Sequence, residues 1–302
     1  MDLSVEVGPL RLRSPLVAAS GTVGSVIEFS RTVDLTVYGA AVAKSISRDP
    51  WPGRSPPRLA PAGLGMLNGI GIQNPGVAAW VAEIGPRLAA LSVPVWGSAV
   101  GTTASEYAEV SRSLARSGVA AIEVNLSCPN LEGGRMFALD PDASAEVVRA
   151  AKASSPVPVG AKLSPNSERI GEVAAAVAGG GADFVTVANT VLGAGIDRIT
   201  RRPVLSGVIG GYSGPPIKPI ALRCVIEVRR AVPSLPIVGC GGVSSGRDVI
   251  EFMLAGAAAV GIGTAHFAEP RAGKRILGEL IEECRRLGVQ SVAELTGGAE
   301  IG

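Results

Sequence analysis

The run Ile122-Glu123-Val124-Asn125-Leu126-Ser127-Cys128-Pro129-Asn130 joins an apolar segment to a polar cluster. Residues 120–124 have the length and apolar character of a buried strand, and turn-forming residues follow them. Because Pro129 disfavours helical geometry at the preceding residue, we expect the Cys128 thiol on extended or turning backbone. The polar cluster is therefore predicted where a strand leaves the core. An ordinary turn with a structural cysteine is the alternative interpretation.

Short apolar runs recur along the chain and alternate with helical patterns. Eight of them are predicted strands, at residues 16–19, 40–43, 93–99, 121–124, 159–163, 184–188, 237–239 and 258–262. Helices are predicted between most of these strands, at residues 76–91, 104–117, 143–154, 167–178, 220–232, 245–255 and 271–287. This alternation indicates parallel βαβ units. An open doubly wound sheet competes with a closed (β/α)8 TIM barrel, and the count of eight evenly apolar strands favours the α/β barrel.

Three features extend the predicted barrel. Residues 4–13 alternate around Gly8-Pro9, which predicts an N-terminal β-hairpin. The intervals 45–75 and 190–219 are long and rich in Gly and Pro, so we interpret them as loop insertions after strands two and six. A further loop follows strand four. We expect one domain over residues 1–302.

The composition excludes several classes of protein. The chain has 302 residues, 47% of them hydrophobic, which is enough for a large core. A net charge of +2 with 18% charged residues gives no nucleic-acid footprint. We expect neither a signal peptide nor a membrane segment. The four cysteines lack CxxC spacing, which argues against a disulfide scaffold or a metal or iron–sulfur site held by this chain alone, and favours a reducing, cytoplasmic setting.

Polar residues lie at the ends of the predicted strands, where a barrel carries its active site. They are Ser20, Lys44, Ser45, Ser98, Asn125, Lys162, Asn189 and Thr190. A lysine in an apolar run is costly to bury without a partner. Lys44 and Lys162 therefore indicate an anionic ligand in the barrel mouth. Two structural salt bridges are the alternative.

Glycine-rich turns follow the last two predicted strands. Gly241-Gly242 and Gly263-Thr264 lie where barrels of this kind bind phosphate, because backbone N–H groups can approach the oxygens there. Neither turn matches a nucleotide fingerprint, and ligand-free tight turns are the alternative. A phosphate site with two lysines suits FMN, whose reduced, anionic form a lysine would stabilise.

The candidate for acid–base chemistry is a thiol. His266 is the only histidine, and we interpret it as structural or surface-exposed. Cys128 is the best candidate base, because positive or hydrogen-bonding neighbours lower a thiol's pKa. We expect the other cysteines, Cys224, Cys240 and Cys284, to be structural.

Four runs carry a resemblance to a known family. They are residues 125–130, Leu67-Asn68-Gly69-Ile70-Gly71-Ile72-Gln73-Asn74-Pro75-Gly76, Lys162-Leu163-Ser164-Pro165-Asn166 and Ser213-Gly214-Pro215-Pro216-Ile217-Lys218-Pro219. Their order and spacing resemble dihydroorotate dehydrogenases with a cysteine base, over about residues 3–268. The Gly-Ile-Gln-Asn-Pro-Gly form is similar to class 1B catalytic subunits. The resemblance then implies a partner subunit that carries FAD and a [2Fe-2S] cluster and passes electrons to NAD, in a heterotetramer built on a homodimer.

The resemblance also implies roles for individual residues. Cys128 would remove the C5 proton of dihydroorotate while hydride from C6 goes to FMN, giving orotate for pyrimidine (UMP) biosynthesis. The implied substrate residues are Lys44, Asn68, Gly69, Ile70, Gly71, Ile72, Asn125, Asn130, Asn189 and Thr190. The implied FMN residues are Ser20, Lys44, Ser45, Ser98, Asn125, Lys162, Ala188, Gly214, Gly241, Gly242, Gly263 and Thr264. The loop 131–140 would be a lid.

The chain departs from the family pattern in three places. Ser98 stands where Asn is usual, Ala188 where a larger aliphatic residue is common, and Pro216 where Ala is usual. Three other functions stay open: an FMN-dependent dihydropyrimidine oxidoreductase, a fumarate-linked class 1A-like enzyme, and an FMN-binding scaffold without activity.

Overall fold

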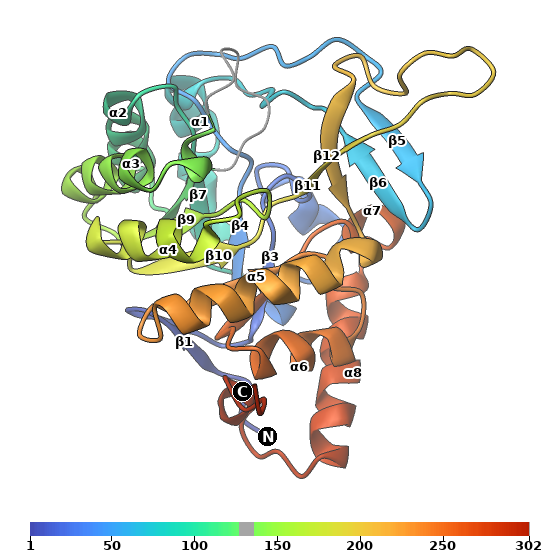
Figure 1. The fold of residues 1–302 in the computed structure, drawn as a ribbon. Helices are drawn as coiled ribbons and strands as arrows, with labels where there is room; N and C mark the ends of the chain where they lie inside the picture. Colours follow the sequence, from blue (N-terminus) through green and yellow to red (C-terminus); the bar gives the residue numbers. More distant parts are fainter. Residues whose placement is uncertain (127–135, 302) are drawn as a thin grey trace.

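A closed barrel of eight parallel strands forms the centre of the molecule (Figure 1). The structure is a computed structural model that describes residues 1–126 and 136–301. The barrel strands are β3 (Leu16–Ala18), β4 (Ala40–Val42), β7 (Val95–Ala99), β8 (Ala121–Asn125), β9 (Val159–Lys162), β10 (Phe184–Val187), β13 (Ile237–Cys240) and β14 (Ala259–Ile262). They close in the order β10-β13-β14-β3-β4-β7-β8-β9. The predicted TIM barrel is confirmed, and every predicted strand overlaps an observed one.

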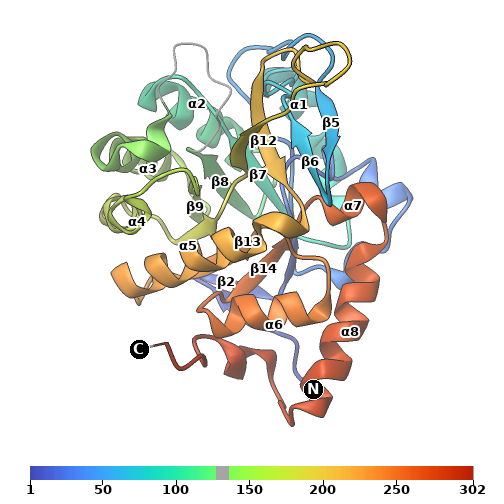
Figure 2. The same cartoon turned by 45° about the vertical axis from the view of Figure 1, so that its right-hand side comes forward.

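Helices surround the barrel (Figures 1 and 2). They are α1 (Val77–Glu83), α2 (Ala104–Ala115), α3 (Pro141–Ser154), α4 (Ile170–Gly179), α5 (Lys218–Ala231), α6 (Gly246–Leu254), α7 (Ala265–Ala268) and α8 (Ala272–Arg286). Short 3-10 turns complete the set: η1 (Phe29–Arg31), η2 (Leu35–Val37), η3 (Gly85–Ala90), η4 (Phe137–Leu139), η5 (Pro215–Ile217) and η6 (Val292–Leu295). Across the described residues, every helix is too short or too polar to span a bilayer.

Local sequence signals explain where these elements begin. Ser245 and Asp248 form the capping box that starts α6. The Asp140 carboxylate caps α3, with Pro141 in the first turn. The N-terminal hairpin is also confirmed: β1 (Val5–Val7) pairs antiparallel with β2 (Leu10–Leu12).

The two long insertions lie over one end of the barrel, as expected, but they also contain strands that the sequence did not predict. β5 (Leu59–Ala62) and β6 (Gly65–Asn68) come from the first insertion, and β11 (Val191–Ala194) and β12 (Ile209–Ser213) from the second. They form one sheet in the order β11-β12-β6-β5, which projects beyond one end of the barrel (Figure 1). A small buried cluster of Ala60, Leu67 and Leu205 packs it. The insertions form strands because each supplies the other's pairing partner.

An apolar layer fills the part of the barrel interior nearer the amino ends of the strands. The rings of Trp96 on β7 and Phe184 on β10 lie 4.8 Å apart between centroids. Gly160 on β9 makes room for this contact, because a Cβ there would lie 2.2 Å from the Phe184 ring. Two residues further along these strands, Ser98 and Thr186 point to the same side. The interior therefore changes from apolar to polar toward the carboxyl ends of the strands.

Candidate functional site

Three predicted site residues form a hydrogen-bonded group at the carboxyl end of the barrel. The hydroxyls of Ser45 and Ser98 lie 2.9 Å apart, and the Asn125 side-chain amide donates to Ser45 Oγ at 3.1 Å. Ser45 and Ser98 are buried. Tyr107, which the sequence did not single out, donates its hydroxyl to the Asn125 carbonyl at 2.8 Å. Ser98, the shorter residue of strand three, is thus bonded to Ser45, which follows β4, and through Ser45 to Asn125 of β8.

Lys162 presents a buried cation to the same region. It ends β9, where it pairs with Asn125 of β8 and with Thr186 of β10, so its side chain points into the barrel. Only 6% of Lys162 is exposed. Within residues 1–126 and 136–301, no hydrogen bond or salt bridge is found for its ammonium group. Among the described residues, no direct salt bridge therefore holds Lys162, and its ammonium is available to an anionic ligand.

Lys44 and Ser20 lie on the other side of the mouth. Lys44 follows β4, is half-buried, and donates its backbone N–H to the Gly24 carbonyl at 2.9 Å. The Ser20 hydroxyl donates to the Ala43 carbonyl at 2.9 Å, which joins the turn after β3 to the end of β4. Both predicted residues therefore lie at the carboxyl ends of barrel strands.

The insertion sheet brings two predicted substrate residues, Asn68 and Thr190, to the same glycine of β12. Asn68 ends β6 and donates its side-chain amide to the Gly211 carbonyl of β12 at 3.1 Å. The Thr190 hydroxyl lies beside Gly211 as well, because a Cβ on that glycine would be 2.1 Å from Thr190 Oγ1. Asn189 accepts the Thr190 N–H at 2.8 Å. The segment from Gly69 to Ile72 follows β6 directly.

Asn166 supports this arrangement, although sequence reasoning gave it no role. Its side-chain amide donates to the Thr190 carbonyl at 3.2 Å, and its oxygen accepts the Leu192 N–H at 2.8 Å. Asn166 therefore fixes the backbone where β10 passes into the second insertion. Its position in the Lys162-to-Asn166 run was the available signal.

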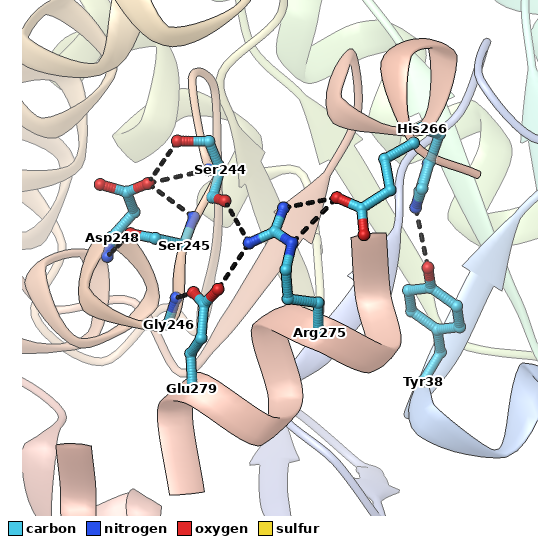
Figure 3. A network of polar contacts seen from close by, with 9 residues as sticks. Tyr38, Ser244, Ser245, Gly246, Asp248, His266, Arg275 and Glu279 are labelled. Atoms are coloured by element: carbon cyan, nitrogen blue, oxygen red, sulfur yellow. Dashed lines mark hydrogen bonds and ion pairs between the residues drawn. The ribbon is translucent and has the colours of Figure 1, made fainter. Parts of the chain in front are cut away.

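The predicted phosphate turn after β13 is held by Asp248. The Oδ2 atom of this residue accepts from the Ser244 N–H, the Ser244 hydroxyl and the Ser245 N–H at 2.8, 2.9 and 2.9 Å (Figure 3). Lys218 donates to Oδ1 at 2.7 Å. Burial opposes the charge of Asp248, but hydrogen bonds from Lys218 and Ser244 outweigh it and lower the pKa of the carboxyl. Asp248, in the first turn of α6, thus fixes the loop after β13, and Lys218 fixes Asp248 in turn.

Helix α8 clamps the same loop from the other side. Arg275 donates to the Ser244 carbonyl at 3.2 Å and to Glu279 at 2.6 Å (Figure 3). Glu279 in turn accepts the Gly246 N–H at 2.8 Å. The loop between Gly241 and Gly246 is therefore fixed by side chains from α5, α6 and α8.

The remaining predicted cofactor residues lie around this loop. Gly263 and Thr264 follow β14, and a Cβ on Gly263 would lie 3.8 Å from Ala19 in the turn after β3. A Cβ on Gly214 would lie 3.8 Å from Thr264 Cγ2, which brings the end of β12 to the same place. Ala188 follows β10 and donates its N–H to the Cys240 carbonyl at 2.8 Å.

Two predicted site residues cannot be placed. Cys128 and Asn130, with residues 131–135 of the predicted lid, lie outside the described residues. Elsewhere the predicted donor set of hydroxyls, amides, one buried ammonium and glycine turns lies at one end of the barrel. Such a set fits a ligand with a phosphate group and a polar ring edge, as FMN has.

The structural interpretation of four residues is confirmed. His266 is 4% exposed and burial lowers its pKa to about 4. Cys224, Cys240 and Cys284 are buried free thiols, and burial raises the pKa of each.

Comparison with known proteins gives a consistent result. The family model described as dihydroorotate dehydrogenase matches residues 2–284. The chain is 45% identical to the "Dihydroorotate dehydrogenase B (NAD(+)), catalytic subunit" of Citrifermentans bemidjiense, over 99% of each chain. It is 45% identical to the protein of the same name from Anoxybacillus flavithermus, over 98% of this chain and 95% of that one.

Among solved structures, the dihydroorotate dehydrogenase of Eimeria tenella in complex with ferulenol has the same fold. Its TM-score is 0.83 at 20% identity, over 98% of this chain and 88% of that chain. The family-model match and the full-length identity to the two catalytic subunits together identify this chain as a member of the dihydroorotate dehydrogenase family.

Proposed function

We propose that this chain oxidises dihydroorotate to orotate, a step of de novo pyrimidine biosynthesis, with one FMN bound in the barrel mouth. The observation that carries the proposal is the buried ammonium of Lys162, which points into the barrel beside the Ser45–Ser98–Asn125 group. FMN, when bound, supplies the two-electron acceptor. The residues that would hold it are Ser20, Lys44, Ser45, Ser98, Asn125, Lys162, Ala188, Gly214, Gly241, Gly242, Gly263 and Thr264.

Cys128 is the proposed base. It follows Asn125 by three positions in the sequence, just beyond the end of β8. A thiolate there would accept the C5 proton of dihydroorotate, a task suited to a group whose pKa lies near the working pH. His266 cannot substitute for it, because both of its ring nitrogens already have hydrogen-bond partners in a buried contact.

The proposed substrate pocket lies between the barrel and the insertion sheet. Its residues are Lys44, Asn68, Gly69, Ile70, Gly71, Ile72, Asn125, Asn130, Asn189 and Thr190. The bonds that join Asn68 to Gly211 and Asn166 to Thr190 support this assignment, because they order amide and hydroxyl groups near the barrel mouth. Such groups suit a small ring that carries amide edges and a carboxylate.

We infer that electrons leave through a second subunit. The support is the printed name of the relatives, which calls them catalytic subunits of an NAD(+)-linked enzyme. The proposed partner carries FAD and a [2Fe-2S] cluster, and the proposed assembly is a heterotetramer on a homodimer of this chain. Within it, the chain acts as a single domain over residues 1–302, in the reducing cytoplasm that its buried free thiols favour.

The test is reduction of bound flavin without oxygen. The purified chain, loaded with FMN, is mixed anaerobically with dihydroorotate, and the flavin absorbance is followed. Bleaching by dihydroorotate and none by dihydrouracil supports the proposal, whereas the reverse pattern contradicts it. Reoxidation of the reduced chain by fumarate would contradict the NAD-linked arrangement and support the class 1A-like one.

A further inference from the structure

Glu123 is a buried carboxylate that the proposed reaction does not use. It lies in the middle of β8, within an otherwise apolar strand, and only 1% of it is exposed. Its Oε2 atom accepts the Thr186 hydroxyl at 2.7 Å. Among residues 1–126 and 136–301, its Oε1 atom has no hydrogen-bond partner. Buried carboxylate oxygens are rarely left unpaired, so this atom needs an explanation.

The strand register places the Glu123 side chain inside the barrel. Glu123 pairs with Ser98 of β7 on one side and with Gly160 of β9 on the other. Paired residues of parallel strands point to the same face, and Ser98 belongs to the group in the barrel mouth. The space over Gly160 is taken by the Phe184 ring. The carboxylate nevertheless crosses β9 and accepts from Thr186 on β10, two strands away.

This path brings the carboxylate to Lys162. Lys162 is the residue of β9 that pairs with Thr186, and it lies two positions beyond Gly160 on the same face. Both ionisable groups also act on the thiol of Cys240, on β13. Burial raises the pKa of that thiol most, while the charge of Lys162 lowers it and the charge of Glu123 raises it. The carboxylate and the ammonium thus share one interior region lined by β8, β9, β10 and β13.

We propose that Glu123 is a positioning residue, which holds the ammonium of Lys162 in place beneath the FMN site. Thr186 fixes one carboxylate oxygen, and the other makes no direct ion pair with Lys162 among the described residues, so the two charges attract across the interior region that they share. Burying a lysine or a glutamate without a counter-charge costs free energy. Here the opposite charges of Glu123 and Lys162 each reduce the cost of burying the other. The pair leaves Lys162 poised to donate to a ligand in the mouth. This inference rests on the proposed function only for the identity of that ligand.

The pairing of Glu123 with Lys162 should be detectable in the stability of the FMN-free chain. Glu123→Gln keeps the shape of the side chain but removes its charge, so it should lower the thermal unfolding midpoint of the wild-type chain. In a Lys162→Met background the same change removes a carboxylate that has lost its cation. There, Glu123→Gln should leave the midpoint unchanged or raise it. Equal lowering in both backgrounds would overturn the proposal.

FMN binding gives the second readout, by quenching of flavin fluorescence. Losing one well-placed, charge-assisted hydrogen bond corresponds to a rise of roughly tenfold or more in the dissociation constant, which is expected for Glu123→Gln. In the Lys162→Met background the further rise should be below about threefold, because Glu123 acts through the lysine. An unchanged FMN affinity in Glu123→Gln alone would also overturn the proposal.

Two further variants keep the result interpretable. Thr186→Val removes only the hydroxyl that holds Glu123. If Glu123→Gln does not fold, Thr186→Val replaces it, and its effect is compared in the wild-type and Lys162→Met backgrounds. Glu6→Gln, on the exposed face of β1, is the matched control and should change neither readout. If the wild-type chain did not bind FMN, the proposed function would fail, while the coupling in the FMN-free chain would still decide the link between Glu123 and Lys162.

Discussion

Tyr38 donates its hydroxyl hydrogen to Nε2 of His266 across 2.8 Å (Figure 3). The direction follows from the other ring nitrogen. Thr22 Oγ1 donates to the Ala19 carbonyl at 2.9 Å, so at 3.0 Å it accepts from Nδ1 of His266. The imidazole is therefore neutral, with its proton on Nδ1. This chain of bonds joins the segment before β4, helix α7 and the turn after β3.

Acid should destabilise the chain through His266. Burial lowers the folded-state pKa to about 4 from 6.5, so the unfolded chain binds a proton first as pH falls. The contribution to stability is complete above pH 6.5 and is lost toward pH 4. By linkage it amounts to about 3 kcal/mol at most. Urea unfolding of the FMN-free chain at pH 7.5 and pH 5 measures the loss, which His266→Gln should largely remove. Equal losses in both proteins would contradict this assignment.

Tyr38→Phe should destabilise the fold at neutral pH, where no change in the protonation of His266 is involved. The substitution removes the donor to His266 and the oxygen that the Gly273 N–H approaches, in a side chain that is 1% exposed. An unpaired buried polar group costs about 1–3 kcal/mol, so we expect a loss in that range from urea unfolding at pH 7.5. Tyr212→Phe is the control, because the Tyr212 hydroxyl makes one longer bond, of 3.2 Å to Ala62, in the insertion sheet. A larger loss for Tyr212→Phe would contradict the prediction.

Asp248→Asn should loosen the turn after β13. The carboxylate accepts bonds from Ser244, Ser245 and Lys218, and an amide cannot keep all of them. We expect a stability loss of about 1–3 kcal/mol and a higher FMN dissociation constant, measured by urea unfolding and fluorescence quenching. Asp197→Asn is the control, since Asp197 caps an exposed turn of the second insertion. If the Asp248→Asn chain bound FMN as tightly as the wild type, the turn after β13 would not contribute to FMN binding, and the prediction would be wrong.

Gly242→Ala should impair the same turn through its backbone. Gly242 has φ +78°, which disfavours a side chain, and a Cβ there would lie 2.7 Å from the backbone nitrogen of Lys218. Because that nitrogen belongs to the start of α5, the turn must move. We expect purified Gly242→Ala to retain much less FMN, measured by absorbance. Gly278→Ala, within α8 and with open space around it, should retain the wild-type amount.

The barrel could be predicted because its signals are local. Each strand is a short apolar run, and caps such as Ser245 with Asp248 mark helix starts within a few residues. The polar residues at strand ends could also be placed together, because a barrel gathers those ends. Asn125, Ser45 and Ser98 confirm that reasoning.

The long-range features could not be predicted from local patterns. The pairing of Tyr212 with Leu67 joins two insertions that are far apart in the sequence, and neither interval shows which partner it has. The partners of His266 come from two other segments, so its burial and tautomer were not visible. Glu123 did carry a signal, a lone charge in an apolar strand. Its meaning depends on Thr186 and Lys162, which the register brings to it.

Cys128→Ser should slow reduction of bound flavin by dihydroorotate by about 100-fold or more near pH 7, the usual range for removing a general base. A hydroxyl is a far weaker base than a thiolate, so the rate of the variant should rise with pH beyond the point where the wild-type rate levels off. Stopped-flow absorbance without oxygen measures both. Cys224→Ala, which changes a buried thiol within α5, should reduce its flavin at the wild-type rate. A Cys128→Ser chain with near-normal reduction at pH 7 would place the base elsewhere, and the amides and lysines of the mouth would then bind the substrate without that thiol.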